Sequence, residues 1–327
     1  MQKYCKAEGT LFPRIHLSLI GFNLAGFRKF GGLGFSIDSP SIKFQVEEFK
    51  EMEIKLYYNS KRLIYKNQIL IDILIKLCLE KKIKVNYSFI FRLESPLHSG
   101  FGTGTNISLA CIESILLLNN IDYTQEYIVD ISKRGRTSGV GIQTYFNGGF
   151  VMDLGVKNKD NIFLPSNSNN SSQISQPLIF NKFPDWESLI CIPSNIKSLT
   201  KEQELLFFKK STPLINNDVY EILYVSLYGV TSAIIENDFE IFCDAINKLQ
   251  LTKWKYLEKL NYKSDIDKIE KKLFNAGAKA IAMSSLGPSL IVFSENINLL
   301  LSNLGTLQND FFLIKTKSTN SGRLLHA

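Results

Sequence analysis

A short stretch of the chain, residues 96–118, begins with three glycines and three hydroxyl side chains within residues 99–105 and then becomes mostly apolar. The glycines follow a G-x-G-x-G spacing, which leaves the backbone N–H groups uncovered and able to turn toward one point. From Ile107 onward apolar residues recur with a helical period, and the N-terminus of such a helix adds unpaired N–H groups and positive partial charge. These features predict a phosphate site, with a helix cap that binds nothing as the alternative. The expected phosphate ligands are Gly100, Gly102, Thr103, Gly104 and Thr105.

A second loop, R-G-R-T-S-G-V-G, places two arginines beside small hydroxyl residues. Arginine is suited to bidentate recognition of phosphate or carboxylate groups. A helix C-terminus is the alternative interpretation, but a cap explains only Arg134 and Gly135. We therefore expect this loop to bind an anion. The candidate residues are Arg134, Arg136, Thr137 and Ser138.

The segment 14–20 alternates polar and apolar residues, which predicts a half-buried strand. Arg14 and His16 fall on its polar face, whereas Leu17 and Leu19 fall on the apolar face. An arginine and a histidine side by side suit the wall of a cleft. The alternative is an exposed strand face with ordinary polar residues.

Three further positions complete the candidate site. Ser284 and Ser285 belong to a third loop of small polar residues, A-M-S-S-L-G-P. His98 lies beside the first glycine loop and could act as a hydrogen-bond donor or an acid, or could be a loop histidine without a role. Glu113 lies one to two turns into the following helix, where it could support Mg²⁺ or simply face solvent.

The elements that must position these residues fall into two groups separated by a polar tract. A strand over 85–94 is expected to lead into the first loop, and 148–155 reads as the last strand of a first domain. Residues 156–184 include a Ser/Asn-rich run that cannot bury enough apolar area to order itself, which predicts a linker or surface insertion. The later part alternates strands and helices in a split βαβ order. We therefore predict an α+β fold with domains at 1–155 and 185–327.

Composition limits the class of function. The chain has 327 residues and a formal net charge of +7 without a dense basic stripe, which favours small anions over nucleic acid. Five scattered cysteines and three histidines make a zinc site improbable and predict a reducing compartment. Neither a signal peptide nor a run of 18 apolar residues is present, so the sequence predicts a cytoplasmic protein without a membrane partner.

Five motifs in order resemble one enzyme family. They are P-R-I-H-L-S-L-I, H-S-G-F-G-T-G-T, R-G-R-T-S-G-V-G, M-S-S-L-G-P and the closing N-S-G-R. Together they are similar to the β-ribofuranosylaminobenzene 5′-phosphate synthases, which belong to the GHMP kinase superfamily. The resemblance implies a GHMP-kinase-like fold, with a ribosomal-S5-domain-2-like N-terminal domain and a ferredoxin-like C-terminal domain.

The resemblance also implies a reaction. Phosphoribosyl pyrophosphate would condense with 4-aminobenzoate or 4-hydroxybenzoate, with loss of CO2 and pyrophosphate, in the synthesis of tetrahydromethanopterin-type cofactors. Mg²⁺ would assist, the arginine loop would hold the pyrophosphate or the 5′-phosphate, and Arg14 and His16 would grip the aromatic acid. A kinase that phosphorylates a small molecule with ATP, and a non-catalytic protein that binds a phosphorylated metabolite, are the alternatives. The sequence leaves homodimer formation open.

Overall fold

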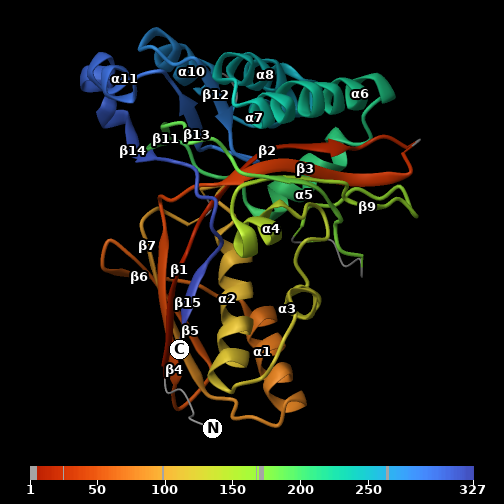
Figure 1. The fold of residues 1–327 in the computed structure, drawn as a ribbon, viewed down its shortest axis with the longest axis vertical. Coiled ribbons are helices and arrows are strands. Elements are labelled where there is room, and N and C mark those ends of the chain that lie inside the picture. The colour runs from red at the N-terminus through yellow and green to blue at the C-terminus, as the bar shows by residue number, and fades with distance from the viewer. Residues whose placement is uncertain (1–5, 25, 98, 167, 169–172, 263–264) are drawn as a thin grey trace.

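The computed structural model describes residues 6–24, 26–97, 99–166, 168, 173–262 and 265–327. Three β-sheets and their helices are stacked along the long axis of the molecule (Figure 1). The first and last strands described, β1 and β15, pair with each other in the half of the molecule away from the C-terminal sheet.

The first sheet contains six strands in the order β15-β1-β4-β7-β5-β6. Helices α1, α2 and α3 lie beside it (Figure 1), and their apolar residues form one core with the strands. Asn67 caps α1 and Thr124 caps α3, in each case by accepting a backbone N–H of the first turn. The bounds are β1 Lys6–Leu11, β4 Ile42–Glu48, β5 Glu53–Tyr58, β6 Lys61–Leu63, β7 Tyr87–Leu93, β15 Leu324–His326, α1 Gln68–Glu80, α2 Thr103–Leu118 and α3 Gln125–Ser132.

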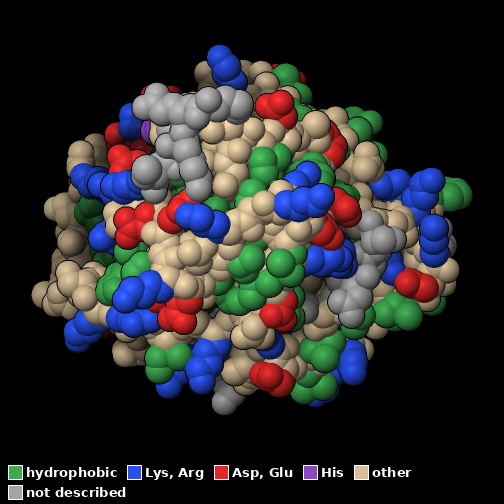
Figure 2. Space-filling view, turned by 90° about the horizontal axis from the view of Figure 1, so that it is seen from below, with side chains coloured by type: hydrophobic (Ala, Val, Ile, Leu, Met, Phe, Trp, Pro, Cys, Tyr) green, Lys and Arg blue, Asp and Glu red, His purple; other side chains and the backbone are tan. Residues whose placement is uncertain are grey.

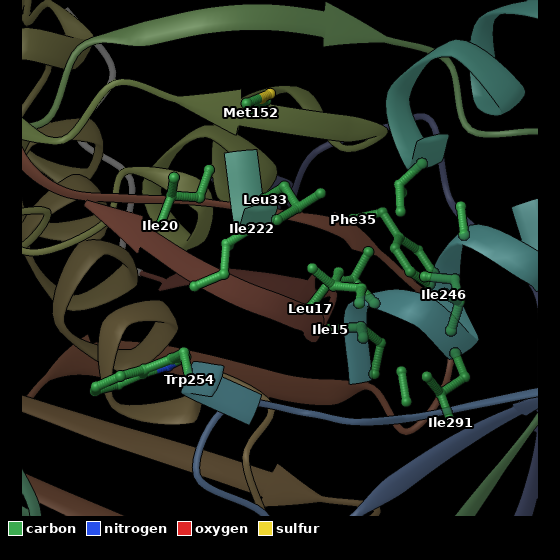
Figure 3. Packing of buried hydrophobic residues seen from close by; sticks show 14 of the residues in the cluster. Ile15, Leu17, Ile20, Leu33, Phe35, Met152, Ile222, Ile246, Trp254 and Ile291 are labelled. Carbon is green, nitrogen blue, oxygen red and sulfur yellow. The ribbon is translucent and has the colours of Figure 1, made fainter. Parts of the chain in front are cut away.

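The second sheet crosses the middle of the molecule in the order β10-β8-β3-β2, with β9 paired to β3. Its buried face packs against helices of the C-terminal half, so residues such as Leu17, Phe35, Ile246 and Ile291 share one core (Figure 3). This continuous core fixes the two halves of the chain against each other. The bounds are β2 Arg14–Gly21, β3 Arg28–Ser36, β8 Phe150–Asp153, β9 Val156–Lys157, β10 Pro177–Asn181 and α4 Val140–Asn147.

The third sheet has the order β12-β13-β11-β14, and every neighbouring pair is antiparallel. In chain order these strands are second, third, first and fourth, which is the arrangement of a ferredoxin-like split βαβ unit. The ferredoxin-like C-terminal fold predicted from the sequence is therefore confirmed. The bounds are β11 Ser188–Pro193, β12 Ala280–Met283, β13 Leu290–Phe293, β14 Phe311–Thr316, α5 Lys201–Ser211, α8 Phe239–Leu251, α9 Lys253–Leu260, α10 Asp265–Asn275, α11 Ile297–Leu304 and the 3-10 turn η2 Gly305–Asp310.

One long helix lies over the second sheet. It is built from α6 Asn216–Tyr224, the π-helical segment η1 Val225–Thr231 and α7 Ser232–Glu236. By length and composition alone this helix would pass for a membrane span, the only such helix in the described part of the chain. Its buried face, which includes Ile222 and Val230, packs into the apolar core, as expected for a core helix.

The segment predicted as a polar linker, 156–184, contains strands β9 and β10 and the buried Phe183. Its Ser/Asn-rich run, 166–173, lies mostly outside the described residues. The chain end also returns to the N-terminal half, because β15 pairs with β1. The domain boundaries at 155 and 185 stay a prediction. In the structure, contacts join residues on either side of these boundaries.

Charges of both signs are interspersed over the end of the molecule that faces away from the C-terminal sheet (Figure 2). Blue and red side chains alternate there without forming a stripe on that face. On this face, the pattern agrees with the sequence, which has a formal net charge of +7 but no dense basic stripe. The expected absence of a nucleic-acid partner stays a prediction.

Candidate active site

A cleft with two connected chambers lies where the three predicted loops meet. The outer chamber, about 470 Å³, is lined by the first glycine loop, and the inner chamber, about 100 Å³, is lined by strand β2 and the arginine loop. Helix α5 covers both chambers, because Glu204 and Phe208 lie one turn apart on the same helix face. The residues that line both chambers are Arg14, Thr105, Ser166, Glu204, Ser285 and Leu286.

The glycine loop delivers the start of α2 to the outer chamber without a side-chain cap. Gly102 is the N-cap residue at φ 75°, and no side chain bonds the first amides. A Cβ at Gly102 would lie 3.1 Å from Cγ of Arg14, and one at Gly100 would lie 2.7 Å from the Ser284 carbonyl oxygen. Glycine is therefore required by both the backbone conformation and the close neighbours. The result is an open helix N-terminus of the kind that binds anions.

Two arginines face this helix start. Arg14 donates from Nη1 to the Gly100 carbonyl oxygen at 2.7 Å, and Arg134 donates from Nε to Oγ1 of Thr105 at 3.2 Å. Neither guanidinium forms an ion pair with a carboxylate among the described residues. Burial, followed by the charge of Arg134, lowers the pKa of Arg14 to about 10, so both groups remain cationic at neutral pH. The charge of Glu204 acts on Arg134. Two neighbouring positive charges that form no ion pair with a carboxylate in the described chain still favour an anionic ligand.

The third loop is attached to both the strand and the glycine loop. Ser284 donates from Oγ to the Gly100 carbonyl oxygen at 2.9 Å and accepts the His16 backbone N–H at 3.2 Å. The Ser285 amide in turn donates to the His16 carbonyl oxygen at 2.8 Å. These bonds join segments that are far apart in the sequence, so the cleft wall is a single hydrogen-bonded unit.

A buried ion pair supports this loop from behind. Lys255, on α9, donates to the carbonyl oxygens of Met283 and Ser285 and to the carboxylate of Glu258. Burial lowers the pKa of Lys255 and raises the pKa of Glu258, while each partner opposes the shift of the other. Phe22, just beyond β2, stacks on Trp254 with a ring separation of 4.0 Å, which fixes α9 against the cleft strand. Glu258 also lines the inner chamber.

A hydrogen-bonded series of three polar side chains starts in the wall of the inner chamber and ends at a buried carboxylate. Nε2 of His16 lies 3.2 Å from Oγ of Ser138, and this hydroxyl donates to Oδ2 of Asp153 at 2.8 Å. Asp153 also accepts the backbone N–H groups of Gly139 and Gly155 and the hydroxyl of Ser175. Burial raises the pKa of Asp153, and the four hydrogen bonds oppose that rise.

A β-bulge changes which residues of β2 face the cleft. The pairing of β2 with β3 shifts register between His16 and Ser18. Arg14 and His16 line the cleft as predicted, but Leu19 lines the inner chamber as well, although strict alternation places it with Leu17. Bulges next to functional sites re-aim side chains in this way.

Most of the predicted site residues come together in the cleft. Arg14, His16, Thr137, Ser138, Ser285, Arg134 and all five residues of the predicted phosphate cradle line one of the two chambers. Ser284 is fully buried behind the wall, where it holds the glycine loop. Arg136 is not among the lining residues, and the charge that acts on it is that of Asp130. His98 lies outside the described residues.

Glu113 is neither the metal ligand nor the solvent-facing glutamate that the sequence suggested. Its side chain is fully buried and forms a bidentate ion pair with Arg323. The hydroxyls of Tyr145 and Tyr123 donate to the same carboxylate at 2.7 and 3.0 Å. Both oxygens are therefore occupied, and Glu113 lines neither chamber.

Within the described residues, no cluster of three or more His, Cys, Asp or Glu side chains could hold a metal ion. Mg²⁺ commonly uses only one or two carboxylates together with substrate phosphates. Glu204 is the carboxylate that lines both chambers. The residues present therefore fit a metal that binds with a phosphorylated substrate and do not fit a protein-only cage.

Sequence reasoning missed several residues of the site. Glu204, Phe208, Lys255 and Glu258 come from helices that the sequence shows only as amphipathic patterns, and no local motif marks them. Asp153 is the first carboxylate after the arginine loop. Its strand follows the double glycine at 148–149, which is the one local signal that could have drawn attention to it.

Comparison with known proteins gave clear relatives, although no family model matches the chain. The chain is 31% identical to a β-ribofuranosylphenol 5′-phosphate synthase of Methanothermobacter thermautotrophicus over 285 residues, covering 85% of both chains. It is 32% identical to the enzyme of the same name from Methanocaldococcus jannaschii, covering 86% of this chain and 88% of the relative.

Solved structures share the fold at low sequence identity. A homoserine kinase from Cytophaga hutchinsonii superposes with a TM-score of 0.67 at 14% identity and covers 100% of this chain and 99% of its own. A mevalonate kinase from Staphylococcus aureus gives 0.60 at 14% identity, with 99% of each chain covered. MDDEF in complex with MVAPP, AMPPCP and magnesium also gives 0.60, at 15% identity, covering 98% of this chain and 99% of its own. The predicted GHMP-kinase-like fold is therefore confirmed.

Proposed function

Because the chain belongs to the family of β-ribofuranosylphenol 5′-phosphate synthases, we propose that it joins a phosphoribosyl group to an aromatic acid with loss of CO2. The donor is phosphoribosyl pyrophosphate, and pyrophosphate is the second product. The phenol in the names of the relatives favours 4-hydroxybenzoate over 4-aminobenzoate as the acceptor.

The single observation that carries this proposal is the pair of arginines at an uncapped helix start. Arg14 and Arg134 face the first turn of α2 without a carboxylate partner in the described chain. Phosphoribosyl pyrophosphate is a polyanion and would supply the missing negative charge. Its phosphates are proposed to occupy the outer chamber, in contact with the amides that follow Gly102.

The inner chamber suits the aromatic acid. Leu19, Phe208 and Leu286 offer apolar walls to the ring, and polar groups also line the chamber. The ring carbon that bears the carboxylate must reach C1 of the ribose, so this end of the acid points to the junction of the chambers. Arg14 lies at that junction and can hold the carboxylate before it is lost.

The proposed reaction begins when pyrophosphate leaves C1 of the ribose with the bonding electrons. Positive charge develops on the sugar, and the helix amides and the two arginines stabilise the negative charge that forms on the leaving group. The ring carbon then bonds to C1, and breaking the bond to the carboxylate returns its electrons to the ring. Walls such as Phe208 keep water away from the reactive sugar.

Mg²⁺ is part of the proposal as a companion of the pyrophosphate. Glu204 is the residue placed to hold it, since its side chain lines both chambers. A bound Mg²⁺ neutralises charge on the departing phosphate oxygens. We also infer a cytoplasmic location, because Cys78, Cys111, Cys191 and Cys243 are free thiols.

The test is to mix the protein with Mg²⁺, phosphoribosyl pyrophosphate and carboxyl-labelled 4-hydroxybenzoate and to measure labelled CO2. Release is expected only when both substrates are present, because the carboxylate leaves after the carbon–carbon bond has formed. Chelation of Mg²⁺ is expected to stop it. Parallel reactions with 4-aminobenzoate identify the preferred acceptor. Release without the phosphoribosyl donor would indicate a simple decarboxylase.

The kinase alternative predicts a different result in the same cleft. It requires a carboxylate base near the glycine loop, and Glu204 is the candidate. Incubation with Mg-ATP and a panel of alcohols would then release ADP in a way that depends on one alcohol. Tight binding of phosphoribosyl pyrophosphate without turnover of either acid would instead support a non-catalytic binding protein.

A further inference from the structure

We propose that Asp153, acting through Ser138, holds His16 in one tautomer so that His16 accepts the proton of the hydroxyl group opposite the reacting ring carbon. This inference rests on the proposed function and deepens it. It makes His16 a catalytic residue for the aromatic substrate and makes Ser138 and Asp153 positioning residues. It also removes Ser138 from the set of phosphate ligands that the sequence suggested.

The hydrogen bonds around Ser138 determine the direction of this chain. Its hydroxyl has one proton and two lone pairs, and it donates the proton to Oδ2 of Asp153 at 2.8 Å. The backbone N–H of Val140 donates to the same hydroxyl at 3.3 Å. The remaining lone pair faces Nε2 of His16 at 3.2 Å, so Nε2 must carry the proton. The hydroxyl is then fully satisfied, with one donated and two accepted bonds.

Asp153 is well placed to fix this direction, because each of its oxygens accepts a backbone N–H. Gly139 donates to Oδ2 at 3.0 Å and Gly155 donates to Oδ1 at 2.8 Å. Two hydroxyls add to these bonds, those of Ser138 and Ser175. Such a set of donors favours the ionised carboxylate, which in turn requires the Ser138 proton.

With its Nε2 proton directed to Ser138, His16 offers the lone pair of Nδ1 to its surroundings. The ring lines the inner chamber. Among the described residues, the one hydrogen bond of the ring is that of Nε2, which leaves Nδ1 for a ligand in the chamber. Burial first, and then the positive charges of Arg14 and Lys255, lower the pKa of His16 and keep the ring neutral. A neutral imidazole with a free lone pair is an acceptor for a hydroxyl proton.

The position of His16 matches the far end of the substrate. Arg14 lies at the junction of the chambers and His16 lies two residues along the same strand, roughly 6.6 Å further at an extended rise. An aromatic acid whose carboxylate faces Arg14 would therefore direct the group at the opposite ring position toward His16.

The proton moves from the substrate hydroxyl to His16 and later returns to the same oxygen. As the ring carbon bonds to the ribose and pyrophosphate leaves, the ring becomes electron-poor and its hydroxyl becomes acidic. The hydroxyl proton moves to Nδ1 of His16, which leaves a neutral dienone ring that still carries its carboxylate. Loss of CO2 returns two electrons to the ring and forms a phenolate, which takes the proton back from His16. No oxidant or external base is needed.

Matched variants separate this role from a structural one. Ser138→Ala and Ser175→Ala each remove one hydroxyl bond to Asp153, but only Ser138 contacts His16. With 4-hydroxybenzoate, Ser138→Ala is expected to lower kcat by roughly 10- to 100-fold, a typical loss for a positioning residue. The KM for phosphoribosyl pyrophosphate should stay unchanged, and Ser138→Thr should restore much of the rate. Ser175→Ala leaves Asp153 with its three other donors and leaves the contact between Ser138 and His16 in place, so it should lose clearly less activity than Ser138→Ala. Equal losses in Ser138→Ala and Ser175→Ala would overturn the proposal.

A second measurement does not depend on turnover. The ring nitrogens of His16 are observed by ¹⁵N NMR of the histidine-labelled protein and assigned with His16→Asn. Wild type and Ser175→Ala should show the Nε2–H tautomer, and Ser138→Ala should show a mixture. A proton on Nδ1 in the wild type would overturn the chain of bonds. If the wild type releases no CO2 with any acid, the proposed function fails, while the tautomer still decides whether Asp153 and Ser138 orient His16.

Discussion

Two charged clusters flank helix α2, and they differ in whether their hydrogen bonds are complete. Near the middle of the helix, Glu113 is fully buried and accepts bonds from Arg323, Tyr145 and Tyr123. At the start of the helix, Arg14 and Arg134 stand together, and no described carboxylate pairs with them. We call the cluster around Glu113 closed, because its charges are paired with one another. We call the cluster of Arg14 and Arg134 open, because no described carboxylate pairs with it.

The contrast shows how structural and ligand-binding charges can be told apart. A buried charge needs partners, so a closed cluster contributes to the fold and has no capacity left for a ligand. Two arginines that form no ion pair with a described carboxylate gain ionic partners when an anion binds. Residue type alone does not make this distinction, since the same helix carries both environments.

The largest expected effect is on stability at the closed cluster. Arg323→Leu would leave the Glu113 carboxylate buried with only two tyrosine donors, and we expect a loss of about 3–5 kcal/mol in the free energy of unfolding. Chemical denaturation measures this loss. Lys76→Ala, which breaks the exposed pair with Glu80, is the control and should cost less than about 1 kcal/mol. Comparable losses in both variants would show that the Glu113 cluster is not the closed unit described here.

At the open cluster the expected effect is on turnover. Arg134→Ala removes one of the two cleft arginines and should cost about 2–4 kcal/mol of transition-state stabilisation, or roughly 30- to 1000-fold in kcat/KM. Stability should change little, because the removed charge has no ionic partner in the described chain.

Arg136→Ala is the matched control from the same loop. The sequence suggested that Arg136 binds an anion, the pyrophosphate or the 5′-phosphate, where it would act on the leaving group, but its side chain lines neither chamber. Its loss should therefore leave kcat/KM close to the wild-type value. A large loss in Arg136→Ala together with full activity in Arg134→Ala would reverse the assignment of the two arginines.

A smaller effect concerns the backbone of the open cluster. Gly102→Ala places a side chain at φ 75° and ψ 15°, and Gly305→Ala places one at φ 50° and ψ −127°. Both conformations are sparsely populated by residues other than glycine, so each variant should lose about 1–3 kcal/mol of stability. The added Cβ at Gly102 meets Arg14, whereas the one at Gly305 has no neighbour within 4 Å. Only Gly102→Ala should therefore also lose affinity for phosphoribosyl pyrophosphate, as measured by titration calorimetry. Equal affinities in the two variants would argue against a phosphate cradle at Gly102.

The open cluster was largely predictable from the sequence, and the closed one was not. Glycine spacing, hydroxyls and a helix start lie within a few residues of one another, so local chemistry reveals the cradle. The partners Glu113 and Arg323 are 210 residues apart, and nothing local shows that the chain end returns to this helix. An isolated glutamate within a helix is therefore easily mistaken for a solvated residue or a metal ligand.

The same distinction holds for the fold. The split βαβ order of the C-terminal half follows from the succession of strands and helices, and it was predicted correctly. The bulge in β2 was not, because it depends on pairing with β3 rather than on the residues 14–20 themselves. Strand β10 was also missed, since it lies beside a polar tract and gains its order from pairing with β8.

The smallest predicted effect is a pH dependence of protein stability, and it tests the positive charge of the open cluster. Burial first, and then the charges of Arg14 and Lys255, hold the pKa of His16 well below its ordinary value. Below about pH 6.5 the unfolded chain therefore binds a proton that the folded protein does not. The free energy of unfolding then decreases by up to ~1.4 kcal/mol for each unit by which the pH falls. His16→Asn cannot titrate, and the stability of the wild type relative to this variant should be constant above that pH and should decrease below it. Urea denaturation of both proteins at pH 7.5, 6.5 and 5.5 measures the difference. A difference that stays constant or grows as the pH falls would mean that the folded protein protonates His16 readily, and the cleft would then lack the uncompensated positive charge that distinguishes it from the closed cluster.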